Sequence, residues 1–422
     1  MKVCIHRGTQ EIGGSCVEIE SQGQRIVLDI GLPLHGADAD GPPLPPVQGF
    51  EHPDPGLLGV IISHAHLDHY GLAHLLPPKT PFLIGQAGEN ILRAAALFSP
   101  TGLGLNCATH LEDRQPIQLG PFAITPFLVD HSAYDAYAIL VQADGRSLFY
   151  TGDLRAHGRK GALFEKLLRE PPSQVDVLLM EGTTVGRPDA EKGFATEAEL
   201  EHAMVEVFKQ MAGMALVWCS GQNIDRLVTV FRACRRAGRQ LIIDMYTAEI
   251  LRATGNANVP QADWDFIKVF LPQSQKRRIK AAGAFDVANR YGKEDRIFSE
   301  KLAAAAPKSV MIFRPSMMAD LDQAKCLNGA GLVYSMWSGY LRDEKNRPLL
   351  QWVADRQIPL VECHTSGHAS VEDLQRLRRC FASAPVVPIH TQHADRFVKL
   401  FGNVQFRKDG QWWTVQKATV VF

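Results

Sequence analysis

Residues 60–71, VIISHAHLDHYG, decide how this chain is interpreted. The run VIIS is typical of a short buried strand. It leads directly into the arrangement H-x-H-x-D-H, formed by His64, His66, Asp68 and His69. Four such side chains cannot all lie in an apolar core without partners, because burying a charge or an unpaired imidazole is unfavourable. A bound metal resolves that conflict.

The donor types indicate which metal this would be. Imidazole and carboxylate together suit zinc, with manganese and iron as the alternatives. Four donors at this spacing are too many for one metal that keeps an open position, so we expect two adjacent divalent ions. Two more strand-like runs end in ligand-type residues, LVDH at His131 and FYTGD at Asp153, and they complete the set.

The composition restricts the class of protein. The chain has 422 residues, and 45 Lys and Arg are balanced by 45 Asp and Glu, so any nucleic-acid binding must come from a local patch. The run KRRIK at residues 276–280 is the preferred patch. No stretch approaches the roughly 18 apolar residues of a membrane span, and the N-terminus has no apolar signal-peptide region. The eight cysteines are scattered without a C-x-x-C pair. We therefore expect a cytoplasmic protein with reduced cysteines and no membrane association.

The periodicity of apolar residues changes along the chain. The first part is rich in short strands, predicted at residues 24–30, 59–63, 121–129, 147–150 and 175–180. Near Thr196 and Glu199 a capping box starts a helix, and a strand at 215–219, a helix at 224–236 and a strand at 240–244 follow. Such β-α-β units build a parallel sheet. Further strands are predicted at 309–313, 331–335, 359–363 and 385–389, and a helix at 371–381.

With these motifs, the sequence resembles the hydrolases of the metallo-β-lactamase fold. The resemblance implies an α/β protein built as an αββα sandwich, with an Asp after an early strand, which Asp29 in VLDIG matches. Asp29 would not bind a metal itself but would orient the residues that do. The resemblance assigns one metal to His64, His66 and His131, a second metal to Asp68 and His69, and a bridging position to Asp153.

Later motifs resemble the β-CASP branch of this fold, which includes ribonuclease J. These motifs are MEGTT around Glu181, HTSGHAS from His364 to Ser370, and VVPIHTQH with His390, which matches a late ligand of the second metal. The opening GTQEIGGSCVEIE also looks like the start of ribonuclease J. The resemblance implies a first part of the sandwich at residues 1–192, an inserted β-CASP domain with a parallel sheet and flanking helices at 193–360, and a final part at 361–422.

The HTSGHAS segment carries groups that suit an anion. A hydroxyl, backbone amides at a glycine and a following helix N-terminus are anion-binding elements, and imidazoles add hydrogen bonds. In the resembled family this segment holds a substrate phosphate, which assigns that role to His364, Ser366, Gly367 and His368. Without the family, a turn with Ser366 and Ser370 as local caps is an equally good interpretation.

The function implied is hydrolysis of phosphodiester bonds with two metal ions, zinc favoured over manganese, by a ribonuclease J-like exonuclease or endonuclease on single-stranded RNA. Asp68, His368 and Glu181 are the candidate catalytic residues. A DNA exonuclease on the same scaffold is the first alternative, and a thioesterase or lactonase is a weaker one. A non-catalytic binding subunit would require a broken metal set, whereas every ligand position is filled here. The chain ends soon after the His390 motif, where ribonuclease J continues into a dimerising C-terminal domain, so a homodimer is left open.

Overall fold

The computed structural model describes residues 1–34, 44–99 and 104–418 of the chain, which divides into two compact units. The first unit is made of residues 1–92, 103–194 and 367–422. The second is made of residues 195–366 and a short segment that begins at Arg93. The predicted ranges differ from these units at three places: the short segment and residues 361–366 lie in the second unit, and residues 193–194 lie in the first.

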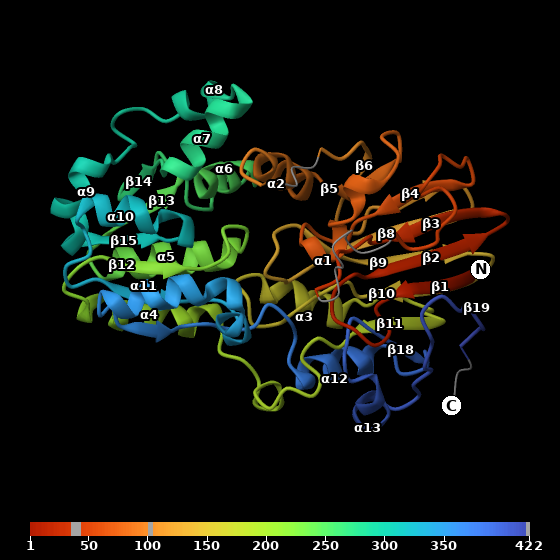
Figure 1. The fold of residues 1–422 in the computed structure, drawn as a ribbon. Helices are drawn as coiled ribbons and strands as arrows, with labels where there is room; N and C mark the ends of the chain where they lie inside the picture. Colours follow the sequence, from red (N-terminus) through yellow and green to blue (C-terminus); the bar gives the residue numbers. More distant parts are fainter. Residues whose placement is uncertain (35–43, 100–103, 419–422) are drawn as a thin grey trace. The chain divides into compact units, whose positions relative to one another are not determined.

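Two mixed sheets form the first unit (Figure 1). The first sheet has the order β19 (Trp412–Thr414), β1 (Lys2–Arg7), β2 (Cys16–Ser21), β3 (Gln24–Leu28), β4 (Leu57–Ile61), β5 (Phe82–Gly85) and β6 (Cys107–Leu111). Its pairs are antiparallel from β19 to β3 and parallel from β3 to β6.

The second sheet has the order β18 (Val386–Ile389), β11 (Val177–Glu181), β10 (Arg146–Tyr150), β9 (Ala136–Ala143), β8 (Phe122–Val129) and β7 (Ile117–Leu119). β18, β11 and β10 are parallel, whereas β9 is antiparallel to both β10 and β8. It follows that β8, β10, β11 and β18 all run in the same direction, so their carboxyl ends meet at one edge of the sheet.

Three apolar cores make this unit a four-layer sandwich. Ile19 of the first sheet and Ile139 of the second lie in a core between the two sheets. On the outer face of the second sheet, Phe149 shares a core with Phe164 and Leu377 from helices. On the outer face of the first sheet, a further core contains residues of α1 and α2. The helices are α1 (Leu67–Tyr70), α2 (Gln86–Ala96), α3 (Gly161–Arg169), α12 (Val371–Cys380) and α13 (Phe397–Phe401), with 3₁₀ turns at Ala73–Leu75, Ala190–Lys192 and Ala394–Arg396. The predicted αββα sandwich is confirmed.

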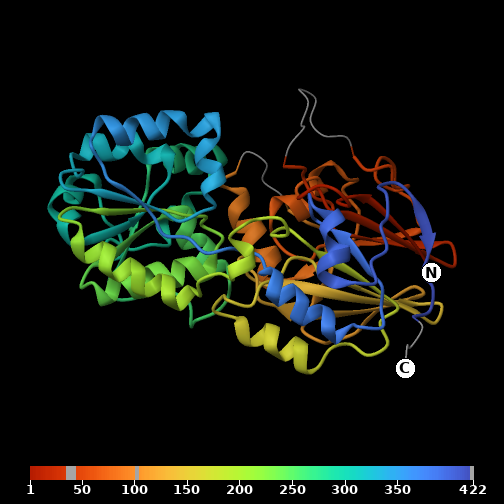
Figure 2. The ribbon, with the colours of Figure 1, turned by 90° about the horizontal axis from the view of Figure 1, so that it is seen from below.

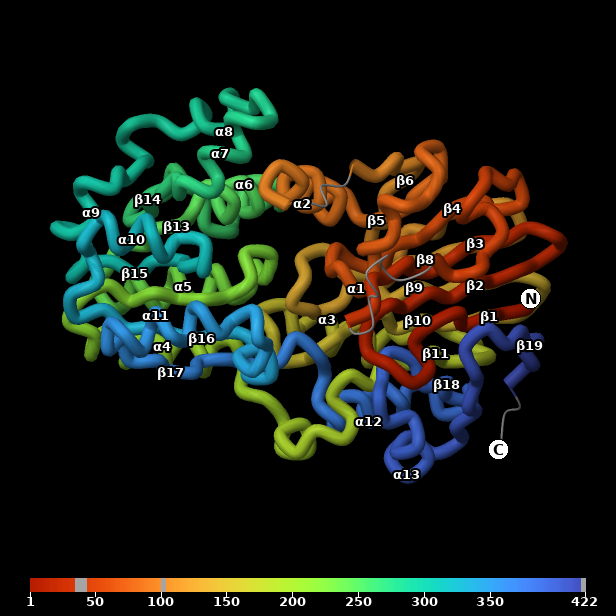
Figure 3. The backbone as a smooth tube through the Cα atoms, viewed as in Figure 1, coloured from red at the N-terminus to blue at the C-terminus, as the bar shows by residue number. Residues whose placement is uncertain are grey.

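The second unit is a parallel sheet with helices on both of its faces, as Figure 2 shows. The order is β14 (Ile267–Phe270), β13 (Gln240–Asp244), β15 (Ser309–Ile312), β12 (Ala215–Trp218), β16 (Gly331–Tyr334) and β17 (Leu360–Glu362), and the chain path can be followed in Figure 3. Every pair in this sheet is parallel. The helices are α4 (Glu197–Gln210), α5 (Ile224–Arg236), α6 (Met245–Ala253), α7 (Gln273–Ala282), α8 (Phe285–Asn289), α9 (Ser299–Ala305), α10 (Met318–Ala324) and α11 (Arg347–Asp355), with 3₁₀ turns at Ala306–Lys308, Pro315–Met317, Ser338–Arg342 and Glu344–Asn346.

The capping box and the helix predicted for residues 224–236 are both found in the second unit. The Thr196 hydroxyl accepts a hydrogen bond from the Glu199 amide at 3.1 Å, and the Glu199 carboxylate accepts one from the Thr196 amide at 2.7 Å. This reciprocal capping box begins α4, and α5 spans the predicted residues. On α7, the cations of the KRRIK run are exposed around the buried Ile279. In the described part of the chain, no helix has the length and apolar character to cross a membrane.

Candidate metal centre

The site lies where strands of both sheets of the first unit end. Asp29 follows β3, and Ser63 and His64 follow β4 in the same sheet. In the second sheet, His131 follows β8 and Asp153 follows β10, and both strands run in the same direction. β11 ends with Glu181, and His390 directly follows β18. Because parallel strands end at a common edge, ligand-type side chains from distant parts of the sequence gather there.

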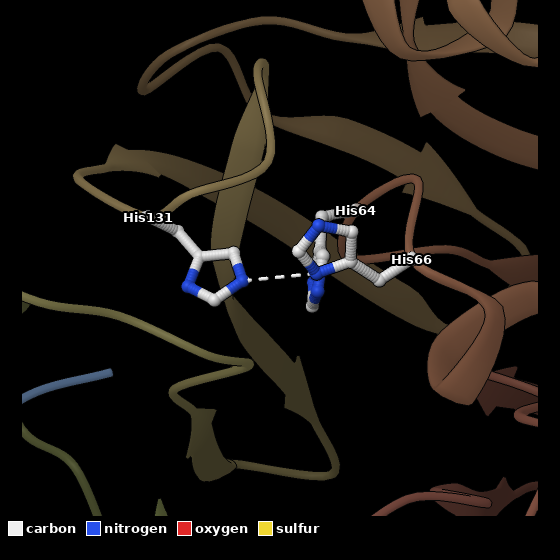
Figure 4. Close-up of side chains that lie close together, drawn as sticks. All are labelled: His64, His66 and His131. Carbon is white, nitrogen blue, oxygen red and sulfur yellow. Dashed lines mark hydrogen bonds between the residues drawn. The ribbon is translucent and has the colours of Figure 1, made fainter. Parts of the chain in front are cut away.

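Three imidazoles form the first group of donors. One ring nitrogen each of His64, His66 and His131 lie within 4.8 Å of one another. Figure 4 shows the three rings close together, with a dashed line from His131 Nε2 to His66 Nδ1, which are 3.2 Å apart. His64 and His131 are fully buried, whereas His66 is half-buried. Three clustered imidazoles of this kind suit one metal ion.

The second group contains two carboxylates and two imidazoles. Asp68, His69, Asp153 and His390 each place a donor atom within 4.8 Å of the others. His69 Nε2 lies 3.1 Å from Asp153 Oδ2, and His390 Nε2 lies 3.5 Å from Asp68 Oδ2. The same Oδ2 atom of Asp153 lies 3.8 Å from His64 Nε2 in the first group. Asp153 is therefore the side chain that stands between the two groups.

Asp29 fixes the donors of the second group through hydrogen bonds to His69 and to the neighbouring Ser63. Its Oδ1 accepts a hydrogen bond from the Ser63 amide at 2.7 Å, and its Oδ2 accepts from the Ser63 hydroxyl at 2.8 Å. The same Oδ2 accepts from His69 Nδ1 and from the Tyr150 hydroxyl, each at 2.7 Å. Because His69 is held through Nδ1, its Nε2 is directed at Asp153. A carboxylate that accepts a hydrogen bond from the other ring nitrogen of a metal-binding histidine fixes the orientation of that ring.

Two residues of the site have left-handed backbone conformations. φ is 60° at Asp29 and 52° at His390. Such values are uncommon for residues other than glycine, although Asp and His tolerate them better than most. The Asp29 amide donates to the Ile61 carbonyl at 2.9 Å, and the His390 amide donates to the Gly8 carbonyl at 2.7 Å. Both conformations are thus held by backbone hydrogen bonds to neighbouring segments.

Burial keeps the first group of histidines neutral. Burial lowers the pKa of His66 to about 4. Burial, together with neighbouring imidazoles, also holds the pKa of His64 and of His131 well below the usual value. Neutral imidazole is the form that binds a metal, so no proton has to leave these three rings at neutral pH.

In the second group, neighbouring charges outweigh the effect of burial on the pKa values of His69 and Asp153. Burial alone would lower the pKa of His69, but the carboxylates of Asp153, Asp29 and Asp68 raise it well above its usual value. Burial alone would raise the pKa of Asp153, but the charges of His390 and His69 hold it well below its usual value. These carboxylates are thus balanced here by positive charge, which a divalent cation also supplies.

A buried nitrogen tests whether a metal fits these residues. His64 Nε2 is fully buried and has no hydrogen-bond partner among the described residues. Leaving such a group unpaired is unfavourable, whereas coordination would satisfy it. With three imidazoles in the first group, and two imidazoles and two carboxylates in the second, the donor set fits divalent metal ions.

His368 and Glu181 lie beside the second group. His368 Nδ1 is 3.7 Å from Asp153 Oδ2 and 3.5 Å from Glu181 Oε2. Burial alone would lower the pKa of His368, but Glu181 and Asp153 raise it. The buried Glu181 accepts hydrogen bonds from the amides of Leu154 and Thr183. Glu181 is thereby fixed so that it can orient His368.

The HTSGHAS segment crosses the boundary between the units. His364 and Ser366 belong to the second unit, and Gly367 and His368 to the first. In the second unit, His364 is exposed and its Nδ1 lies 3.3 Å from Nη1 of the buried Arg226. In the first unit, α12 begins after Ser370, whose hydroxyl accepts from the Asp373 amide at 3.1 Å.

Four further residues support the site, and the sequence analysis missed them. Ser63 and Tyr150 donate to Asp29, as described above. Asp130 and Arg155 are both fully buried, and Arg155 Nε donates to Asp130 Oδ1 at 3.3 Å. The Asp130 carbonyl also accepts from the Arg155 amide at 2.7 Å, which ties the segment before His131 to the segment after Asp153. Ser63 and Asp130 each directly precede a proposed ligand in the sequence, whereas Tyr150 and Arg155 have no such signal.

Comparisons with known proteins find relatives of similar sequence and fold. Residues 24–221 match the family model described as a beta-lactamase superfamily domain. The chain is 22% identical to ribonuclease J of Helicobacter pylori over 405 residues, which is 93% of this chain and 56% of that protein. It is 24% identical to ribonuclease J of Mycolicibacterium smegmatis, over 57% of this chain and 44% of that protein.

An archaeal protein and a solved structure are also similar. An RNase J-like protein of Methanocaldococcus jannaschii is 28% identical over 265 residues, 59% of each chain. A crystal structure of a protein of unknown function from Enterococcus faecalis shares the fold, with a TM-score of 0.78 and 19% identity, over 98% of this chain and 99% of that one. The chain spans about half the length of the curated relatives that it matches.

Proposed function

We propose that this chain is a metal-dependent nuclease that hydrolyses phosphodiester bonds in single-stranded RNA. The chain has the metallo-β-lactamase fold, and it resembles the ribonuclease J-like hydrolases of the β-CASP branch. The observation that carries the proposal is the pair of ligand groups at the strand ends, with Asp153 between them. The RNA substrate is supported by the ribonuclease J relatives. A DNA exonuclease on the same scaffold is the alternative.

Two divalent ions, zinc or manganese, would be held by these groups. His64, His66 and His131 would hold one, and Asp68, His69 and His390 the other, with Asp153 shared. When bound, such ions lower the pKa of water and stabilise the negative charge that grows on a phosphate during hydrolysis. The protein's own contribution is to fix the donors. Asp29 Oδ2 accepts a hydrogen bond from His69 Nδ1 at 2.7 Å, and Asp29 is itself held by the Ser63 amide at 2.7 Å and the Ser63 hydroxyl at 2.8 Å.

Three side chains are proposed to handle protons and orient the substrate. His368 has a donor nitrogen next to Asp153 and is proposed to donate a hydrogen bond to a phosphate oxygen. Glu181, whose Oε2 lies 3.5 Å from His368 Nδ1, is proposed to position His368. Asp68 is half-buried beside His390 and is proposed to assist proton transfer. Such positioning accelerates the reaction because it holds the phosphate in line with the attacking oxygen.

His364, Ser366 and Gly367 are proposed to bind a neighbouring substrate phosphate. Their support is chemical: an exposed imidazole, a hydroxyl and a glycine amide precede the capped N-terminus of α12. The exposed cations of the KRRIK run on α7 are proposed to attract the RNA backbone. Cytoplasmic location and a homodimer stay predictions.

The test uses a single-stranded RNA labelled at its 5′ end, carrying a monophosphate or a triphosphate, and a DNA of the same sequence. We expect His66→Ala and Asp153→Ala to abolish RNA cleavage while the circular dichroism spectrum is kept. His202→Ala is the matched control, because His202 is an exposed histidine on α4, and it should cleave like the wild type.

The products also separate the alternatives. Release of mononucleotides would show exonuclease action, and internal fragments would show endonuclease action. Cleavage of the DNA but not of the RNA would move the proposal to a DNA exonuclease. Metal-dependent cleavage that persists in Asp153→Ala would refute the proposed centre.

A further inference from the structure

A second set of side chains that could bind a metal lies outside the proposed catalytic centre. Glu89, on the first turn of α2, and Cys107 and His110, on β6, each place a donor atom within 4.8 Å of the other two. All three belong to the first unit. We propose that Glu89, Cys107 and His110 form a separate zinc site that ties the edge strand β6 to helix α2.

The register of β6 places Cys107 and His110 together. In a regular strand alternate residues share a face, so residues three apart point to opposite faces. In β6, Cys107 pairs with Phe82 and Thr109 pairs with Leu83, so two residues of β6 advance against one of β5. This irregularity shifts the alternation by one residue, as a bulge does. Cys107 and His110 can therefore turn toward the same neighbour.

That neighbour is Glu89. The chain runs from β5 through α2 to β6, and β5 and β6 are parallel partners, so α2 packs against the sheet as the connecting helix. Leu92 of α2 lies in the apolar core on that face of the sheet. The Glu89 side chain is 8% exposed, and its Oε2 lies 2.7 Å from His110 Nε2. A carboxylate that is this deeply buried needs a cation or a hydrogen-bond donor as a partner, and the His110 ring lies within hydrogen-bond distance.

The donor types select the metal. A thiolate, an imidazole and a carboxylate are all ligands of zinc, and three protein ligands leave a fourth position for water. A thiolate donor disfavours magnesium and calcium, which prefer oxygen. Cys107 and His110 are half-buried, so an ion can reach them from solvent.

The distances are close to those that zinc needs. Donors at about 2.0–2.3 Å from a tetrahedral zinc ion lie roughly 3.3–3.8 Å from one another. The separation of up to 4.8 Å here must shrink, and the short contact between Glu89 and His110 must open. Two of the three side chains are partly exposed, so they have room to rotate toward a shared ion.

Cobalt substitution tests the site by spectroscopy. The donors of the proposed catalytic centre are all nitrogen and oxygen, so a thiolate-to-cobalt charge-transfer band in the near ultraviolet would report a cysteine ligand. We expect this band in the cobalt-loaded full chain and its loss in Cys107→Ser. Cys380→Ser is the matched control, because Cys380 is also half-buried and lies on α12, and it should keep the band.

Metal analysis gives an independent readout. Purified Cys107→Ser and His110→Ala should each contain one zinc ion fewer per chain than the wild type, while RNA cleavage is unchanged. Absence of the band from the wild type, or a band that persists in Cys107→Ser, would overturn the proposed site. The site does not rest on the proposed nuclease function, because the band and the zinc content are measured without a substrate.

Discussion

Replacing Asp29 by asparagine tests how the metal centre is held. Asp29→Asn keeps the shape of the side chain but exchanges one acceptor oxygen for an NH₂ donor. At Asp29, Oδ2 accepts three hydrogen bonds, from Ser63 Oγ, His69 Nδ1 and Tyr150, and Oδ1 accepts one from the Ser63 amide. The asparagine should therefore place its oxygen at the Oδ2 position and its NH₂ against the Ser63 amide.

The expected loss has two parts. Two donors then face each other in a fully buried place, and losing one hydrogen bond to a charged acceptor costs about 1.5–3 kcal/mol of folding free energy. His69 also loses its ionised partner, and changing such a partner of a metal-binding histidine lowers metal affinity about 10- to 100-fold. That range corresponds to about 1.4–2.8 kcal/mol of binding free energy.

Zinc titration against a chromophoric chelator measures the affinity, and urea unfolding of the metal-free protein measures stability. Both proteins keep Cys107, so any ion bound there cancels in the comparison. Tyr150→Phe is the matched control, because it removes one donor to Oδ2 and leaves the carboxylate ionised. Its loss of affinity should be smaller than that of Asp29→Asn. Equal zinc affinity in Asp29→Asn and the wild type would refute the orienting role.

Two further predictions concern the second unit. Thr196→Ala removes the side-chain cap of α4 and should lower the free energy of unfolding by about 1 kcal/mol in urea titrations, with Thr196→Ser close to the wild type. Burial alone would raise the pKa of the carboxyl of Glu249, but hydrogen bonds from Arg252, Tyr291 and Arg290 hold it below its usual value. Because this folded-state pKa lies below the unfolded value of about 4.3, the ionised carboxylate stabilises the fold above that pH, and the contribution is lost as the pH falls through the folded pKa. Glu249→Gln should therefore be less stable than the wild type at pH 7, with a difference that narrows in acid; a difference independent of pH would contradict this.

The local signals in the sequence were strong where one segment carries all the information. The capping box at Thr196 and the helix N-cap at Ser370 depend on residues three apart, so their outcome needed no tertiary contact. The strands β3, β8 and β10 were also predicted, because each is a short apolar run between polar residues.

The sequence analysis missed other elements. It did not predict β9, which is nearly all apolar, or α2, although the buried residues of α2 recur at helical spacing. A strand that is buried on both faces shows no alternation of apolar and polar residues in its sequence. These elements are defined by what packs on each side of them.

The sequence by itself determined which chemistry this protein can carry. The H-x-H-x-D-H run after a buried strand places four donors in one short segment, and no arrangement of the rest of the chain could leave them in an apolar core without a partner. The αββα sandwich followed from the same motif through its resemblance to a family. The nature of the donors, nitrogen and oxygen, was fixed at the same level.

Only the tertiary structure decided how the distant ligands, which the family resemblance had already assigned, come together. His131, Asp153 and His390 meet because β8, β10 and β18 run in one direction and end at one edge. The hydrogen bonds of Tyr150 to Asp29, and the turn of Cys107 toward Glu89 through an irregular register, leave no periodic trace in the sequence. The physical reason is that strand direction and register are set by pairing between segments far apart in the chain, whereas a local pattern reports only which face of one segment is buried.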